Sequence, residues 1–127
     1  MRITKKEIVT KIHLIISICI VVPTAFIYGF APELSFDMFL ETVDEHNFYK
    51  AIMGLYFGFS VLWLLGIYNV NYLKIALVTN VIFMLGLGCG RLVSLALDGM
   101  PTFGYKFGTI AELFLGFYGL WVLRHHR

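Results

Sequence analysis

Apolar residues fill four long and nearly uninterrupted stretches of this chain, over residues 12–30, 48–68, 73–97 and 107–123. Each stretch is close to or above the ~17–20 residues that an α-helix needs to cross the hydrocarbon core of a bilayer. The segments between them leave no room for a separate soluble module. The pattern predicts an all-α integral membrane protein, a bundle of four transmembrane helices that forms one domain over residues 1–127.

Composition supports the membrane class. Of the 127 residues, 59% are hydrophobic and 14% are charged, and the mean hydropathy is +0.81, whereas a soluble domain carries about 25% charged residues. A net charge of +2 is too small for the basic face that nucleic acid requires. We therefore expect the protein to contact membrane lipid and not to bind nucleic acid. The first stretch exceeds the ~7–15 apolar residues of a signal peptide, and we expect a retained span.

Basic residues indicate the orientation of the spans. The segment 31–47 holds acidic residues but no Lys or Arg, and only Lys50 and Lys106 join it on that side of the membrane. Apart from Arg91, which lies inside the third stretch, the other basic residues fall on the opposite side: Arg2, Lys5, Lys6, Lys11, Lys74, Arg124 and Arg127. Because basic residues favour the cytoplasmic side, both termini are expected in the cytoplasm.

The connection after the first span has a pattern of its own. Phe36, Phe39, Leu40 and Val43 recur at helical spacing between acidic residues, and Ser35 stands where an N-cap would. The spacing predicts a short extracytoplasmic amphipathic helix over residues 36–43, lying at the membrane surface. It would either cover the end of the bundle or gate a pocket there, and we favour the cover.

Two charges lie inside apolar stretches, Arg91 in the third and Glu112 in the fourth. A charge near the centre of a bilayer costs about 2.5–3.5 kcal/mol even on the most lenient scale, so such residues face inward and pair. Successive spans with a short connection are antiparallel neighbours, which brings Arg91 and Glu112 to a similar depth. We therefore expect an ion pair in the outer half of the membrane. Ser94 and Asp98 share a helix face with Arg91 and are candidates for the same polar centre.

The second span supplies the other candidates. Lys50 enters just inside the outer surface, with Asn47 before it and Tyr56 deeper. Lys50 can point inward to the carboxylates or extend to the interface, and both possibilities stay open. If it points inward, the charges of Lys50, Arg91, Asp98 and Glu112 sum to zero, as burial favours.

Other polar and small residues have structural explanations. Gly54 with Gly58, and Gly86 with Gly90, are spaced as in closely packed membrane helices, and Gly108 and Gly116 flank Glu112 on the same face. Asn80 is expected to hydrogen-bond between helices. The cysteines and histidines lack the spacing of a zinc or haem site, so we predict no metal and no cofactor.

The polar segments together resemble a known family. Residues 47–56 (NFYKAIMGLY), 90–91 (GR), 98–101 (DGMP) and 112–113 (EL) are similar to the small bacterial membrane proteins of domain-of-unknown-function family forty-three forty-five. The resemblance implies a four-helix bundle in the bacterial inner membrane and implies no activity. Many relatives have Arg where Lys50 stands, which weakens a bidentate role there. A looser likeness to DoxX-type proteins, some of them linked to quinone chemistry, concerns the fold alone.

The polar centre has four possible interpretations. Its charges can be a structural staple between helices, which is the simplest single explanation. They can form a site for a lipid, a quinone-like ligand or a membrane protein partner, including a second copy of the chain. A minimal proton-coupled transporter is a third possibility, although the chain shows no inverted repeat. An enzyme with Glu112 and Asp98 as acid and base is the least supported, so we expect no enzyme. Binding or accessory work leads the functional interpretations.

Overall fold

Long helices make up almost all of the structure. The computed structural model describes residues 5–34 and 39–125, and within these residues there are four long helices: α1 (Lys5–Phe30), α2 (Val43–Tyr68), α3 (Leu73–Asp98) and α4 (Phe103–His125). The short 3-10 turns η1 (Pro32–Leu34) and η2 (Val70–Tyr72) lie in the connections. Each long helix has the length and hydropathy to cross a membrane. The prediction of an all-helical chain with these candidate spans is confirmed, and the helices continue through the polar residues that flank the apolar stretches.

The start of α2 differs from the prediction. Thr42 caps the helix: its hydroxyl accepts a hydrogen bond from the backbone N–H of Glu45, and the Glu45 carboxylate accepts one from the backbone N–H of Thr42. This reciprocal cap starts α2 at Val43. The amphipathic helix expected over residues 36–43 is not found where the structure describes it, because residues 39–42 are not helical and Val43 belongs to α2. Ser35 and residues 36–38 lie outside the described residues.

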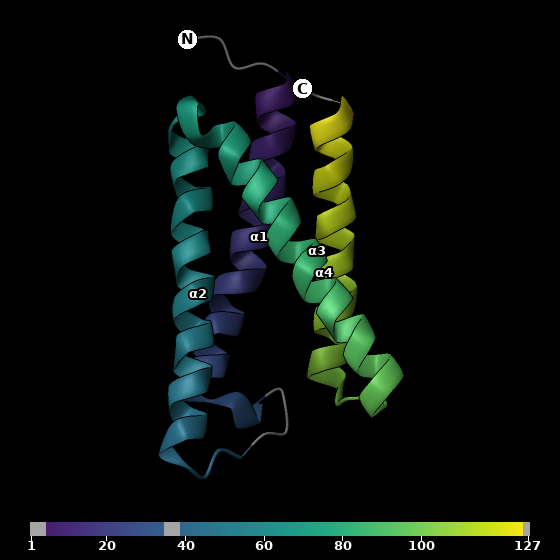
Figure 1. Ribbon diagram of the computed structural model, residues 1–127. Helices are drawn as coiled ribbons and strands as arrows, with labels where there is room; N and C mark the ends of the chain where they lie inside the picture. The colour runs from purple at the N-terminus through teal and green to yellow at the C-terminus, as the bar shows by residue number, and fades with distance from the viewer. Residues whose placement is uncertain (1–4, 35–38, 126–127) are drawn as a thin grey trace.

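The helices alternate in direction between two ends of the bundle. The start of α1, the end of α4 and η2 lie at one end, which we term the terminal end (Figure 1). The turn η1 and the connection between α3 and α4 lie at the opposite end, the loop end (Figure 1). At the loop end, Gly99 takes a positive φ of 103°, a conformation that favours glycine, and it terminates α3.

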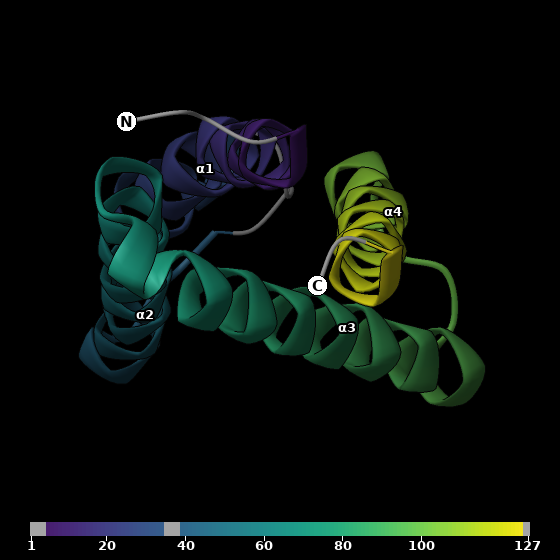
Figure 2. The same cartoon turned by 90° about the horizontal axis from the view of Figure 1, so that it is seen from above.

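Packing divides the bundle into two hairpins. Helix α1 packs mainly on α2, and α3 packs mainly on α4. Helix α3 starts beside α2 and leans toward α4 along its length, so that the hairpins diverge toward the loop end (Figures 1 and 2). The buried core therefore sits where all the helices meet, and it includes Leu14, Trp63, Met84 and Leu115.

The glycine pairs predicted in α2 and α3 are not the ones that allow close packing, whereas Gly116 of the predicted pair in α4 does allow it. A Cβ added at Gly54, Gly58, Gly86 or Gly90 would meet no described atom within 4 Å. Other glycines do permit close approach between helices, because an added Cβ would collide with a neighbouring residue: Gly29 with Met53, Gly66 with Ala76, Gly88 with Leu113, Gly116 with Leu85, and Gly119 with Val81 and His13. Spacing within one helix identifies small faces, but it does not say which face meets a partner.

Candidate functional site

Arg91 and Glu112 form an ion pair between α3 and α4. Arg91 Nε lies 2.6 Å from Glu112 Oε1, and Arg91 Nη2 donates to Glu112 Oε2 at 3.2 Å. The side chains are only 18% and 11% exposed. Two parallel hydrogen bonds between a guanidinium and a carboxylate form a strong, geometrically specific contact. The pairing predicted from the sequence is confirmed.

Two tyrosines complete the surroundings of the guanidinium. Tyr28, a buried residue of α1, accepts a hydrogen bond from Arg91 Nη2 at 2.9 Å. The ring centre of Tyr105, in the first turn of α4, lies 5.6 Å from Arg91 Cζ, which is the range of a cation–π contact. Arg91 thus joins three helices, because α1, α3 and α4 all contribute to its contacts.

Aromatic rings continue from Tyr28 into the bundle. Tyr56 of α2 meets Tyr28 edge to face, with ring centres 5.5 Å apart, and it meets Phe83 in the same way at 5.3 Å. Tyr49 also stacks on Tyr28, with ring centres 6.0 Å apart. Such rings contribute apolar contact area together with fixed geometry, so they give this part of the bundle a rigid wall.

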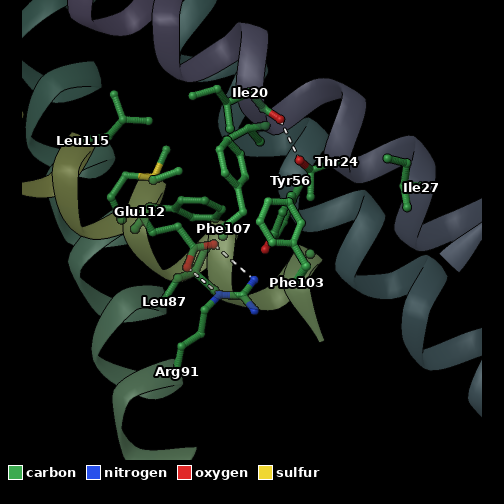
Figure 3. A pocket seen from close by; sticks show the side chains of 16 residues that line it. Ile20, Thr24, Ile27, Tyr56, Leu87, Arg91, Phe103, Phe107, Glu112 and Leu115 are labelled. Carbon is green, nitrogen blue, oxygen red and sulfur yellow. Dashed lines mark hydrogen bonds and ion pairs between the residues drawn. The ribbon is translucent and has the colours of Figure 1, made fainter. Parts of the chain in front are cut away.

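A cavity of about 400 Å³ adjoins the ion pair, bounded mainly by α1, α3 and α4. Figure 3 shows Arg91 and Glu112 on its wall, with the Tyr56 hydroxyl directed toward them. Most other lining residues are apolar, including Ile20, Leu87 and Leu115 (Figure 3). The cavity is therefore an apolar space with one concentrated polar region.

A larger cavity of about 930 Å³ lies mainly between α2 and α3. Four residues line both cavities: Tyr56, Phe83, Leu87 and Arg91. Arg91 therefore stands where the cavities meet, in the region where the hairpins diverge. Its Nη1 group has no hydrogen-bond partner among the described residues, because Nε and Nη2 make all of its hydrogen bonds. Arg91 thus keeps donor capacity that no described residue uses, since a guanidinium has five N–H groups.

The remaining predicted residues do not join the ion pair. Asp98 is exposed and accepts a hydrogen bond from Ser94 Oγ at 2.8 Å, so these residues form a separate pair in the last turn of α3. Lys50 is exposed, and its Nζ lies 5.5 Å from the ring centre of Phe30, so it does not point inward. Asn47 is exposed near the start of α2. Of the candidates beyond Arg91 and Glu112, only Tyr56 is brought to the pair.

The physical reason for these differences is depth. Asp98 and Lys50 stand close to helix ends, where water or a neighbouring polar group satisfies a charge at small cost. Arg91 lies about 10 Å from the end of α3 at 1.5 Å per residue, so its charge needs a partner inside the bundle. The four-charge centre, which required Lys50 to point inward, is therefore not formed, and the ion pair of Arg91 and Glu112 remains.

Tyr28 and Tyr105 are the contacts that the sequence analysis missed. Tyr105 stands seven residues before Glu112 and therefore on the same helix face, a signal that the sequence does carry. Tyr28 lies on a helix distant in sequence, and an uncharged phenol does not demand a partner as a buried charge does. Only the packing of α1 against α3 reveals it.

Among the described residues, no disulfide and no metal-binding cluster accompanies the site. Cys19 and Cys89 are free and exposed on their helices. Among residues 5–34 and 39–125, no group of three or more His, Cys, Asp or Glu side chains is placed to hold a metal ion. The site therefore offers an overall neutral ion pair, phenol groups and an apolar cavity.

Comparison with known proteins identifies the family but no activity. A family model described as Domain of unknown function (DUF4345) matches residues 9–123. No curated protein and no solved structure matches the chain. The match does not extend to the looser likeness to DoxX-type proteins, which stays an expectation. The matched residues 9–123 contain the ion pair, both cavities and nearly all of the helices. Because the model matches almost the whole chain, the chain belongs to the Domain of unknown function (DUF4345) family.

Proposed function

We propose that this protein spans the bacterial inner membrane with its helices α1 to α4 and binds a neutral, carbonyl-bearing amphipathic molecule, a membrane lipid or a quinone, beside Arg91. The observation that carries the proposal is the position of Arg91 at the junction of the two cavities, with Nη1 unengaged by any described residue. Ligand sites are typically apolar cavities with a few well-placed polar groups.

Charge favours a neutral ligand. The positive charge of Arg91 is balanced by Glu112, and the remaining cation nearby on α2, Lys50, faces outward. An anionic headgroup would add an unbalanced charge to a buried neutral pair, which is costly in a low dielectric. A carbonyl oxygen accepts the Nη1 hydrogen bonds without that penalty, and an apolar tail fits the aliphatic and aromatic walls.

The orientation follows from the basic residues. The described basic residues at the terminal end are Lys5, Lys6, Lys11, Lys74 and Arg124. At the loop end, acidic residues outnumber Lys50 and Lys106. The positive-inside rule then places the terminal end in the cytoplasm and the proposed site in the outer half of the membrane.

The first experiment identifies what the site holds. Protein purified in mild detergent is analysed by native mass spectrometry and by lipid extraction, and it is then titrated separately with decylubiquinone and with dioleoylphosphatidylethanolamine. We expect one of these molecules, or a co-purified relative of it, to bind at one per chain. The titration that saturates distinguishes a quinone from a lipid. Wild-type protein that carries neither molecule and binds neither would contradict the proposal.

A structural staple is the alternative explanation, favoured by the way Arg91 joins α1, α3 and α4. The substitution Arg91→Lys distinguishes a ligand site from a structural staple. A lysine retains a positive charge for Glu112 but lacks the planar fork that leaves a second amino group available to a ligand. If the site binds a ligand, we expect the folded variant to lose at least tenfold in affinity, with Tyr68→Phe, at an 81% exposed position, as the unaffected control. Unchanged affinity in the lysine variant would favour the staple.

A further inference from the structure

A second group of buried polar side chains lies in the half of the bundle nearer the terminal end. His13 of α1, Trp63 of α2 and Asn80 of α3 are each 0% exposed. His13 Nδ1, Trp63 Nε1 and both polar atoms of the Asn80 amide have no hydrogen-bond partner among the described residues. We term these three residues the terminal-end layer. None of them lines the cavities beside Arg91.

Contacts between the helices place these residues at one level. Gly66 of α2 packs directly against Ala76 of α3. Trp63 lies one turn before Gly66 and Asn80 one turn after Ala76, so on antiparallel helices both side chains lie at the same depth. A Cβ added at Gly119 of α4 would meet Val81 and His13 together, which brings His13 to the level of residues 80 and 81.

Hydrogen-bond chemistry determines what this layer can bind. His13 Nε2 lies 2.8 Å from the backbone carbonyl oxygen of Leu115. A carbonyl can only accept, so Nε2 carries the hydrogen, and Nδ1 of the neutral ring is an acceptor. The terminal-end layer therefore presents acceptors at His13 Nδ1 and Asn80 Oδ1 and donors at Asn80 Nδ2 and Trp63 Nε1.

We propose that the terminal-end layer is an internal water-binding site. A water molecule both donates and accepts, so it matches a mixed set of donors and acceptors. A cation would face the donor groups of Trp63 and Asn80, and an anion would face the acceptors. Buried polar groups in folded proteins are almost always paired, and internal waters commonly make about three hydrogen bonds to groups of this kind.

The water site is separate from the proposed ligand site. Met84 lies one turn beyond Asn80 on α3 and is 1% exposed, and Leu115 of α4 is also 1% exposed. Both residues line the cavity beside the ion pair, so their apolar side chains lie between it and the terminal-end layer. The buried hydroxyls at this level, those of Ser17 and Ser60, donate to carbonyl oxygens of their own helices, so the water site does not depend on the identity of the ligand.

Replacing Asn80 with the near-isosteric leucine should change the Tm in opposite directions, depending on whether the terminal-end layer holds water or is dry. Loss of the amide would leave His13 and Trp63 without their bridging water, so we expect the Tm of the detergent-solubilised protein to fall by at least a few degrees. In a dry layer, Asn80→Leu would remove two unpaired polar atoms and raise the Tm. Thr10→Val is the matched control, because its buried hydroxyl already donates to the Lys6 carbonyl oxygen at 2.8 Å. An unchanged or higher Tm for Asn80→Leu would overturn the proposal.

A second measurement guards against a steric effect of leucine. Pulsed radiolysis of water generates hydroxyl radicals in place, and residues beside bound water are oxidised even when they are buried. We expect Trp63 to be oxidised in the wild-type protein and at least threefold less in Asn80→Leu, with Trp121, which is 49% exposed, as the internal reference. Absence of Trp63 oxidation in the wild type would overturn the proposal even if the Tm falls.

Discussion

Arg91 and Glu112 show how burial turns two ordinary side chains into an obligatory pair. The hydrogen bonds between them hold α3 to α4, and Tyr28 extends the contact to α1. Removing one member of such a pair leaves an uncompensated charge, whereas removing both members costs much less. The pair can therefore be tested for stability and for ligand binding in different variants.

At this scale we predict opposite outcomes for single and double substitutions. Glu112→Gln should lower the free energy of unfolding by about 3–5 kcal/mol, because Arg91 loses its counter-charge. The double variant Arg91→Met with Glu112→Leu should recover most of that loss. Reversible unfolding followed by circular dichroism in mixed micelles measures both values. Asp98→Asn is the control, since Asp98 is exposed and outside the pair, and its effect should stay within about 0.5 kcal/mol. A Glu112→Gln protein as stable as the wild type would show that the pair does not matter for folding.

At the scale of the helices, close contacts rather than glycine spacing decide the packing. Gly116 lies against Leu85 of α3, and a Cβ there would approach Leu85 Cδ2 to 2.5 Å. A Cβ added at Gly58 would have no described atom within 4 Å. Both glycines lie inside helices, so the propensity gain from alanine is similar at the two positions.

We therefore predict different effects of the same substitution on two helices. Gly116→Ala should lower the free energy of unfolding by about 1–3 kcal/mol, because the added methyl group overpacks the contact between α3 and α4. Gly58→Ala should be neutral or stabilising by up to about 1 kcal/mol, because the helix gains propensity without a collision. Thermal melts of the two variants in the same detergent compare them directly. The prediction fails if the two substitutions have equal effects.

At the scale of the whole molecule, charge asymmetry between the ends predicts the orientation. Glu41 stands at the loop end and Asn71 at the terminal end, and both are exposed. In a variant with Cys19 and Cys89 replaced by alanine, Glu41→Cys should react with a membrane-impermeant maleimide in intact cells. Asn71→Cys should react only after the cells are permeabilised. Labelling in the reverse order would place the terminal end outside and would move the proposed ligand site to the inner half of the membrane.

Several features of this protein follow from the sequence alone, because their energies are local or large. The long apolar stretches predict the helices, since every backbone group in an apolar medium must be satisfied within the segment. The pairing of Arg91 with Glu112 is predictable because two charges at one depth on neighbouring helices have no cheaper arrangement. Whether Lys50 and Asp98 join the polar centre could not be predicted in this way, since charges near helix ends can be satisfied in more than one way.

Tertiary structure alone decided which helix faces meet. The contact of Tyr28 with Arg91 joins α1 to α3, and the contact of His13 with Gly119 joins α1 to α4, so both join helices that are distant in sequence. Such contacts depend on the tilt of α3 between the hairpins, which results from the combined packing of many side chains (Figure 1). Hydropathy and spacing within one helix carry no information on that tilt, so the cavities, the tyrosines around Arg91 and the terminal-end layer emerge only when the helices are packed together.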